Sequence, residues 1–180
     1  MSRETKNFKR SVVSERSPDG FDRKILSVLV TNAETSFAEL GRIVGLSAPA
    51  VFERVKRLKK SGAIRAVCAL LHGPSVDRPF LAFVHVDVAG WGKEQKMLKL
   101  ADFPEVEEMH SVAGDTGLII KVRTRDSHAL EQLLAQIYDL PGVTGTKSYV
   151  VLSTFLERPV QAETTEEWPT VSQFLPPQGS

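Results

Sequence analysis

The chain has 180 residues, of which 42% are hydrophobic and 25% are charged, and its formal net charge at pH 7 is +1. This composition is typical of a globular protein with enough apolar residues for two small cores, and it excludes a fibrous or wholly disordered chain. No apolar run approaches the ~20 residues that a membrane-spanning helix needs, and the N-terminus lacks the apolar stretch of a secretory signal, so we expect a cytoplasmic protein with no membrane partner.

The first segment, residues 1–19, is polar and charged and shows no sustained hydrophobic period. We expect a flexible arm there, which is either a plain solvated tail or a source of loose phosphate contacts. From Phe21 an apolar stripe recurs at helical spacing behind Asp19 and Asp22, two acids that suit the N-terminus of a helix. The sequence therefore predicts a first helix that runs to about Val30.

Two more helices follow within the next thirty or so residues. Ser36 with Glu39 three residues later has the spacing of a capping box, and Gly45 ends the helix that this box begins. Ser47 can cap a third helix, which closes near Gly62. Two helices joined by a tight turn containing glycine, the second one basic, predict a helix-turn-helix with the first helix packed behind it.

The third predicted helix has small residues at its start and cations along its exposed side. Small residues let a helix sit deep in the major groove of DNA, arginine can pair bidentately with phosphate or guanine, and lysine acts as a point charge. We predict the following DNA-binding residues: Ser47, Ala48, Pro49, Ala50, Arg54, Lys56, Arg57 and Lys60.

The distribution of charge favours this interpretation over a helix face that is merely solvated. Residues 1–66 contain 14 Lys and Arg against 7 Asp and Glu, whereas residues 67–180 contain 9 against 15. A basic half joined to an acidic half is expected when one domain meets a polyanion and the other does something else. We therefore expect double-stranded DNA as a partner.

After Gly62 the hydrophobic period changes from that of a helix to that of a strand. The single cysteine, Cys68, lies in the apolar run AVCALL, where a packed thiol is expected and no internal disulfide is possible. The predicted elements are a strand at 63–71, a linker at 72–79, a strand at 80–88, a helix at 92–102, strands at 106–112 and 118–124, a helix at 127–138 and a strand at 146–156.

From residue 80 onward the order strand, helix, strand occurs twice, and the segments FPEV and LPGV each introduce a strand. Two such halves give a four-stranded antiparallel sheet with two helices on one face, the ferredoxin-like βαββαβ plan. We therefore predict an α+β protein, and a partner subunit is the obvious cover for the other sheet face. The predicted division is a flexible arm at 1–19, a helix-turn-helix domain at 20–66, a strand and linker at 67–79, a ferredoxin-like domain at 80–157 and a flexible tail at 158–180.

Five segments carry a resemblance to a known family: FDRKILSVL, FAELGRIVGLS, VFERVKRLKKSGAI, VAGDTGLIIKV and LPGVTGTKSYVVL. In their order and spacing they resemble the leucine-responsive regulatory protein/AsnC (Lrp/AsnC) transcription regulators, from about Phe21 to Leu156. The resemblance implies a winged or extended helix-turn-helix, a strand hinge and a regulatory domain that forms homodimers, possibly tetramers or octamers. It also implies an amino acid or related small molecule that binds between dimers and changes assembly or DNA affinity.

The turn Gly114–Gly117 is where the chain departs from the family pattern. Many amino-acid-responsive members have an aromatic residue and then an acid after the Gly-Asp pair, whereas this chain has Thr116 and Gly117. Gly and Asp also suit an ordinary tight hairpin without any ligand, and that explanation stays open. The predicted effector-binding residues are Gly114, Asp115, Thr116 and Gly117, with Thr146 and Ser148 contributing across subunits.

Two other functions are compatible with this architecture. A chromosome-organising protein without an effector needs only basic helices and oligomerisation. Some enzymes that decarboxylate a modified tetrapyrrole resemble the family in architecture, and His110 and Arg123 are the side chains nearest to what such a reaction needs. These two residues are too separated for us to assign catalytic residues, so we expect no enzyme, and with four scattered histidines we expect no metal ion and no cofactor.

Overall fold

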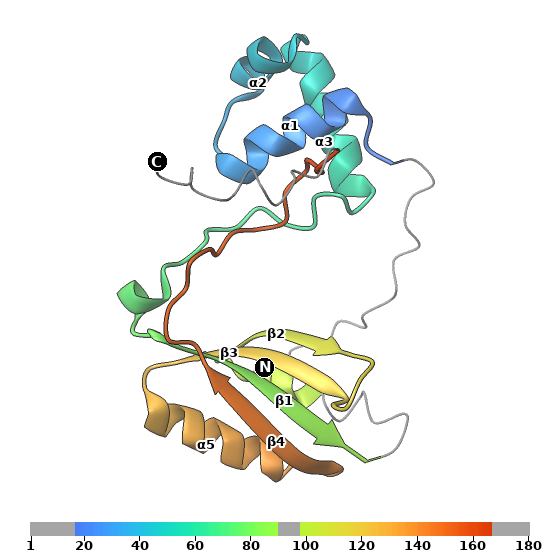
Figure 1. Cartoon of the computed structure of the whole chain (residues 1–180). Coiled ribbons are helices and arrows are strands. Elements are labelled where there is room, and N and C mark those ends of the chain that lie inside the picture. Colours follow the sequence, from blue (N-terminus) through green and yellow to red (C-terminus); the bar gives the residue numbers. More distant parts are fainter. Residues whose placement is uncertain (1–16, 90–97, 167–180) are drawn as a thin grey trace, which may run out of the picture. The chain divides into compact units, whose positions relative to one another are not determined.

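The computed structural model describes residues 17–89 and 98–166 (Figure 1). The described chain divides into two compact units. The first contains the residues up to Cys68 together with those from Arg158 onward, and the second is Ala69–Glu157. No helix in the described ranges is both long enough and apolar enough to cross a membrane.

The first unit contains three helices, α1 (Gly20–Thr31), α2 (Phe37–Val44) and α3 (Ala48–Lys60). The predicted caps are present, because the hydroxyl oxygens of Ser36 and Ser47 each accept a hydrogen bond from the backbone amide three residues later. This arrangement confirms the helix-turn-helix. The described residues before position 69 contain no strand, so they form no wing.

The reciprocal capping box lies at α1 rather than at α2. Asp19 accepts from the backbone amide of Asp22, and the backbone amide of Asp19 donates to the Asp22 carboxylate. At the start of α2 the Glu39 side chain binds Arg42 instead of returning to the cap. The sequence therefore predicted the beginning of each helix but assigned the two-way box to the wrong one.

The turn between α2 and α3 depends on two glycines. Gly45 has a φ of 75°, the left-handed conformation that favours glycine at a helix end. A Cβ on Gly41 would collide with the carbonyl oxygen of Leu46, so only glycine lets the chain return this closely. The small core of this unit consists of Ile25, Leu40, Val44, Val51 and Val55.

The second unit is an antiparallel sheet with the strand order β2-β3-β1-β4. Its elements are β1 (Phe80–Val88), β2 (Val106–Ser111), β3 (Leu118–Thr124), α5 (Ser127–Tyr138) and β4 (Val143–Val150). This order is that of the predicted ferredoxin-like plan, with β1 and β3 in the centre of the sheet (Figure 1).

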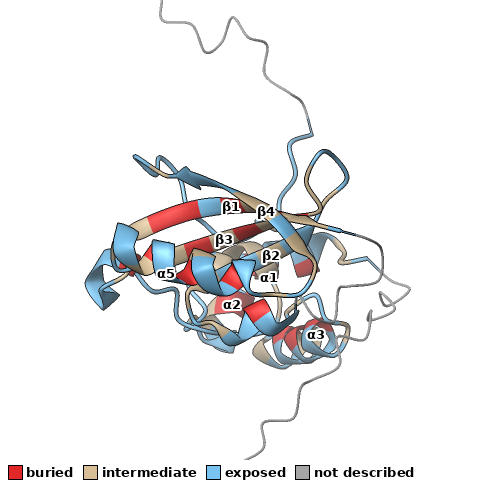
Figure 2. Ribbon diagram, turned by 90° about the horizontal axis from the view of Figure 1, so that it is seen from below, coloured by how far each residue is buried: buried red, intermediate tan, exposed pale blue. Residues whose placement is uncertain are grey.

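Helical segments cover one face of this sheet. The core combines strand positions that alternate along the chain with α5 and the 3-10 helix η2 (Leu98–Asp102), and Figure 2 shows its buried residues in red. The buried members are Ala82, Val84, Val86, Leu100, Leu118, Ile120, Val122, Leu130, Leu133 and Ile137. We call the opposite side of the sheet, which carries the intervening strand residues such as Phe83 and Tyr149, the open face.

The predicted helix at 92–102 lies partly outside the described residues, which omit 90–97. Its described end is the 3-10 helix η2, and Leu100 is the fully buried side chain there. The spacing of a regular helix over 92–102 predicts that Leu98 and Ala101 face inward, which is wrong, since both are exposed. The tighter 3-10 winding changes which positions share a face compared with an α-helix.

The strand predicted at 63–71 is absent from the structure. These residues form an irregular segment in which Cys68 and Leu70 are exposed, so the expected packed thiol is also wrong. A strand exists only when a neighbour completes its hydrogen bonds, and the segment pairs with none of the described strands. The short 3-10 helix η1 (Gly73–Val76) follows it.

The last strand is shifted from its predicted range of 146–156. β4 begins at Val143, pairs with β1 up to the contact between Val150 and Ala82, and then ends. The strand stops because β1 begins at Phe80 and offers little backbone beyond that point. Leu152 and Phe155, which were predicted to lie in the strand, are almost fully exposed.

The predicted terminal arm and tail fall largely outside the described residues, since 1–16 and 167–180 are not described. Within the described part of the tail, the carbonyl oxygen of Ala162 accepts a hydrogen bond of 3.0 Å from the guanidinium of Arg23 in α1. The flexibility of both termini stays a prediction.

Candidate nucleic-acid interface and ligand turn

The exposed side of α3 presents small residues first and cations later. Ser47 and Pro49 are exposed, and Ala48 and Ala50 are half-buried, so the first turn of the helix has a low profile. Lys56 and Lys60 are exposed, and Lys56 lies 3.9 Å from Glu53, which is equally exposed. The N-terminal turn and these two lysines therefore remain accessible to a partner.

Arg54 has a different environment from the lysines. Its Nη1 donates to Asp19 at 2.7 Å and to Asp22 at 2.8 Å, and its guanidinium lies 5.4 Å from the centre of the Phe21 ring. The side chain is only 23% exposed. The structure thus places Arg54 in the contact between α1 and α3, and its assignment as a DNA contact stays a prediction.

Arg57 lies at the outer edge of the same cluster. Its Nη2 donates to both carboxylate oxygens of Asp22 at 3.0 Å, while 54% of its side chain is exposed. We call Asp19, Asp22, Arg54 and Arg57 the acid–arginine cluster. The hydrogen bond that Arg54 donates lowers the pKa of Asp19, and the hydrogen bonds that Arg54 donates to Asp19 and Asp22 raise its own pKa, so Asp19 and Arg54 stay charged at neutral pH.

The first unit carries an exposed aromatic pair that includes Phe37, although helical spacing predicts that Phe37 is buried with Leu40. The rings of Phe37, at the start of α2, and Phe52, on α3, meet edge to face with their centroids 5.5 Å apart. Both residues are exposed, and the Lys56 ammonium lies 6.0 Å from the Phe52 ring centre. The spacing of four residues on one helix indicated that Phe52 and Lys56 are neighbours, whereas local sequence contained no sign of the contact between Phe52 and Phe37.

The predicted effector turn connects β2 and β3. Gly114 and Asp115 are exposed, whereas the Thr116 hydroxyl lies within hydrogen-bond distance of the carbonyl oxygens of Val86, at 3.3 Å, and Leu118, at 3.4 Å. Since a hydroxyl has one proton, these two acceptors compete for it, and only its lone pairs remain for a ligand. Among the side chains of the turn, that of Asp115 is the most accessible to a ligand.

The second glycine of the turn has a packing role. A Cβ at Gly117 would lie 2.9 Å from the Cγ2 atom of Val88, so the turn approaches β1 closely there. A Cβ at Gly114 would meet nothing within 4 Å, which leaves its backbone accessible. The two glycines that sequence reasoning treated alike therefore differ in role.

Thr146 and Ser148 lie on β4, across β1 from the turn. Thr146 pairs with Val86 and Ser148 with Val84 in the antiparallel register. Because Thr116 also bonds the carbonyl of Val86, the turn and Thr146 approach the same β1 residue from opposite sides. The backbone amide of Thr146 is occupied by the Tyr138 hydroxyl at 3.2 Å.

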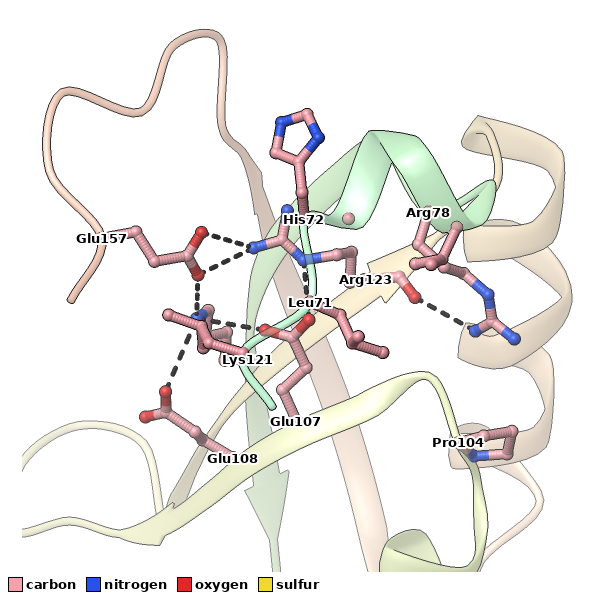
Figure 3. A pocket seen from close by; sticks show the side chains of 12 residues that line it. Leu71, His72, Arg78, Pro104, Glu107, Glu108, Lys121, Arg123 and Glu157 are labelled. Atoms are coloured by element: carbon pink, nitrogen blue, oxygen red, sulfur yellow. Dashed lines mark hydrogen bonds and ion pairs between the residues drawn. The ribbon is translucent and has the colours of Figure 1, made fainter. Parts of the chain in front are cut away.

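A groove of about 810 Å³ lies elsewhere on the second unit, between residues 70–78 and the strands β2 and β3 (Figure 3). Leu70, Leu71 and Val76 supply its apolar side. Its floor is charged and belongs to the open face of the sheet, as the close view shows. Arg78, which also lines the groove, forms an ion pair with Glu105 at 3.0 Å.

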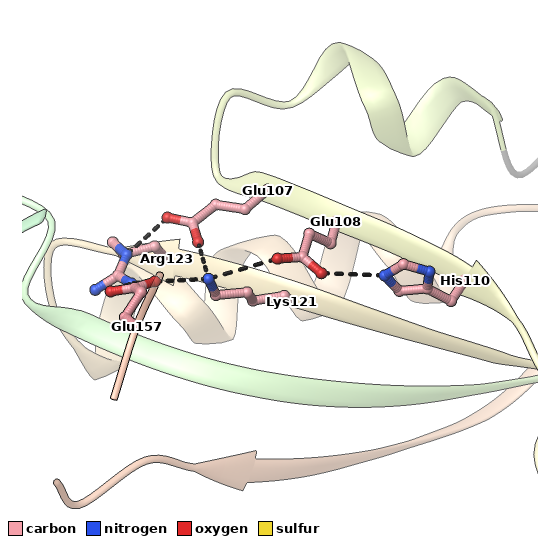
Figure 4. A network of polar contacts seen from close by, with 6 residues as sticks. All are labelled: Glu107, Glu108, His110, Lys121, Arg123 and Glu157. Atoms are coloured by element: carbon pink, nitrogen blue, oxygen red, sulfur yellow. Dashed lines mark hydrogen bonds and ion pairs between the residues drawn. The ribbon is translucent and has the colours of Figure 1, made fainter. Parts of the chain in front are cut away.

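The groove floor is a network of ion pairs, drawn in Figure 4. Lys121 Nζ contacts Glu107 at 3.1 Å and Glu157 at 2.7 Å, and Arg123 contacts the same two carboxylates at 2.6 and 2.9 Å. Glu157 thereby fixes the chain after β4 to the centre of the sheet. Lys121 and Arg123 are 15% and 12% exposed, whereas Glu157 is 43% exposed.

The contacts favour the charged forms of Glu157 and Lys121. Hydrogen bonding from Lys121 lowers the pKa of Glu157, and burial, which lowers the pKa of Lys121, is more than offset by Glu157 and Glu107. Arg123 binds these acids through Nε and Nη2, and His110 lies 3.1 Å from Glu108. The two side chains considered for catalysis belong to one network, because Glu108 binds both His110 and Lys121, and Lys121 shares its other acids with Arg123.

Comparison with known protein families gives two matches. Residues 19–59 match the AsnC-type helix-turn-helix domain, and residues 81–161 match the Lrp/AsnC ligand binding domain. The chain is 32% identical over 139 residues to the HTH-type transcriptional regulator FL11 of Pyrococcus horikoshii, covering 77% of this chain and 92% of that protein. It is 36% identical over 138 residues to the leucine-responsive regulatory protein of Escherichia coli K12, covering 74% and 84%.

Solved structures give the same result. A transcriptional regulator from Neisseria meningitidis in complex with L-methionine aligns with a TM-score of 0.74 at 28% identity, covering 79% of this chain and 94% of that one. Escherichia coli AsnC aligns with a TM-score of 0.74 at 26% identity, covering 81% and 99%. The similarity thus extends over both units of the fold.

The ion-pair network predicts a pH-dependent stability. Glu157→Gln should lower the free energy of unfolding at pH 7 by about 1 kcal/mol, a value limited by the solvent exposure of Glu157. Because the folded-state pKa of Glu157 is lowered, its contribution is fully present above the ordinary carboxyl range and disappears as the pH falls through the lowered value. Calorimetric unfolding at pH 7 and pH 3, with Glu131→Gln on α5 as the control, measures this difference. Equal effects at the two pH values would contradict it.

Proposed function

Because this chain belongs to the Lrp/AsnC family of transcriptional regulators, we propose that it binds specific DNA sites as an oligomer and that an amino acid or related metabolite modulates its DNA binding or assembly. It is a transcriptional regulator with a helix-turn-helix domain and a ligand-binding domain. The observation that carries the proposal is that α3 is exposed, with small side chains in its first turn and cations along the rest of its length.

DNA binding is assigned to the accessible side of α3. The first turn, from Ser47 to Ala50, enters the major groove because its side chains are small, and its backbone amides face phosphate or base edges. Lys56 and Lys60 supply net positive charge, and Arg57 adds directed hydrogen bonds. The cytoplasm is the compartment that this role requires, and no cofactor is needed for it.

Self-association is assigned to the open face and to the extended segments beside it. Phe83 and Tyr149 are 39% and 50% exposed on the open face, and Leu152 and Phe155 project from the chain after β4. This apolar surface is more than a small domain normally leaves in water, which supports a second copy as its cover. We propose a homodimer, with tetramers or octamers as further steps of assembly.

An effector site is assigned to the turn after β2. The exposed Asp115 carboxylate can receive an ammonium group, and the open backbone at Gly114 can receive a carboxylate. Thr116 contributes only lone pairs, and Thr146 and Ser148 are weaker contacts from a neighbouring subunit. The Neisseria regulator that binds L-methionine supports an amino acid as the chemical class.

The relatives are named transcriptional regulators, which supports a regulator rather than an enzyme. His110 and Arg123 both contact acids of this chain, which supports a structural role for them rather than a site for the carboxylates of a tetrapyrrole. The effector-independent chromosome-organising function differs from the proposal only in ligand binding, so the ligand experiment below separates the two.

The DNA-binding proposal predicts a strong dependence on salt. If each subunit of a dimer neutralises about three phosphates, log K should fall with log salt with a slope of about −5. Lys56→Ala and Lys60→Ala should each reduce this slope by about 2, one contact from each subunit. Lys24→Ala on α1 is the matched control and should change it little. Affinity that stayed constant between 50 and 200 mM salt, measured by fluorescence anisotropy with duplex DNA, would contradict the proposal.

The assembly proposal predicts that the open face controls molecular mass. Phe83→Glu places a charge in the apolar part of that face and should convert an oligomer into a monomer at micromolar concentration, as measured by light scattering. Leu98→Glu on η2 is the control, since Leu98 is exposed on the other side of the unit. A wild-type protein that is already monomeric at this concentration would refute the proposed interface.

The effector proposal predicts one preferred small molecule. A thermal-shift screen of the amino acids, their precursors and their breakdown products should find a stabilising compound. In calorimetry, Asp115→Ala should weaken its binding about tenfold or more because a charged hydrogen bond is lost. Asp102→Ala is the control for removal of a surface acid. Unchanged binding by Asp115→Ala would move the site elsewhere, and no stabilising compound would favour the effector-independent function.

A further inference from the structure

The carboxylate of Asp22 is nearly enclosed by two arginines of a different helix. Asp22 is 4% exposed, lies in the first turn of α1, and accepts hydrogen bonds from both Arg54 and Arg57 of α3. A buried carboxylate is stable only when it is paired in this way. Its two partners differ in position, because Arg54 is 23% exposed and Arg57 is 54% exposed.

Arg57 is held through a single nitrogen of its guanidinium. Only Nη2 contacts Asp22, with both carboxylate oxygens at 3.0 Å. Within the described part of the chain, Nε and Nη1 of Arg57 have no hydrogen-bond partner. The two contacts at Nη2 restrict where the planar guanidinium lies and leave its remaining donors for a partner.

We propose that Asp22 is a positioning residue for DNA binding, which orients Arg57 so that its free donors meet a phosphate or a guanine edge. This inference rests on the proposed DNA-binding function. An unrestrained arginine must lose rotamer freedom when it binds, and a pre-ordered one has already lost it. Asp22 is therefore a positioning residue, whereas Arg57 is the residue that touches DNA.

The net charge of the acid–arginine cluster distinguishes orientation of Arg57 from electrostatic attraction of DNA. Two carboxylates balance two guanidiniums, so the cluster adds little net charge, and the long-range attraction comes from the α3 lysines. If Asp22 acted only as a competing anion, its removal would strengthen DNA binding. Orientation predicts the opposite sign, which makes the two roles distinguishable.

The test is a double-mutant cycle in the full-length protein. A duplex is first selected from a random pool by the wild type, and affinity is measured for this duplex and for a scrambled one. Asp22→Asn and Arg57→Ala should each weaken binding to the selected duplex about tenfold, and the double variant should be no weaker than Arg57→Ala alone. Arg57→Lys should resemble Asp22→Asn, because it keeps the charge and loses the planar contact.

The ratio of the two affinities distinguishes orientation from stability. Loss of orientation lowers the selected-to-scrambled ratio, whereas partial unfolding lowers both affinities by the same factor. Asp19→Asn is the matched control, since it removes a carboxylate from the same cap that contacts Arg54 but not Arg57, and it should leave the ratio unchanged. Additive losses, tighter binding by Asp22→Asn, or an unchanged ratio would each overturn the proposal.

The outcome also identifies which claim has failed. A wild type that selects no duplex from the pool refutes the DNA-binding function and this inference together. A wild type that selects a duplex with high affinity, combined with additive effects of Asp22→Asn and Arg57→Ala, refutes only the positioning role.

Discussion

A four-stranded sheet with helical cover on one face only is the constraint on which most of the second unit depends. The covered face accounts for the apolar core. The open face has two regions, one with charges on β2 and β3 and one with aromatic side chains on β1 and β4, where His85 and Tyr149 have ring centres 5.0 Å apart. Since the charges are satisfied by one another, the face can be covered without leaving an unpaired ion.

The first unit solves a different problem, the contact between a helix that must bind a polyanion and the helices that support it. Two acids at the start of α1 bind arginines of α3, while the lysines of α3 remain exposed to solvent. Attraction and orientation are thereby assigned to different side chains. An α3 with cations alone would attract DNA but would have weaker attachment to its own domain.

The fold was largely predictable, because its signals are local. Ser36 and Ser47 marked two helix starts, the hydrophobic period distinguished strands from helices, and the sheet order followed from the repeated strand-helix-strand pattern. The prediction of a strand at 63–71 was wrong because a strand forms only beside a neighbouring strand, which local sequence does not reveal. The prediction of where β4 ends was wrong for a similar reason, since the length of β4 is set by where β1 begins.

The candidate sites were less predictable, because they depend on contacts between distant residues. Arg54 looked like an exposed cation, but its partner Asp22 lies 32 residues away in the sequence. Thr116 looked like a free hydroxyl, but its proton is shared with a strand that precedes it by 30 residues. Helical spacing identifies an exposed face but does not show which members of that face are already paired.

The exposure of Cys68 has a practical consequence for spectroscopy. The chain has one cysteine and the thiol is accessible, so a maleimide fluorophore would label each subunit once without any substitution. The label lies at the boundary between the two units, one residue before the second begins. Energy transfer between fluorophores on different chains would then report directly on how far apart these boundary segments lie, with and without DNA or ligand.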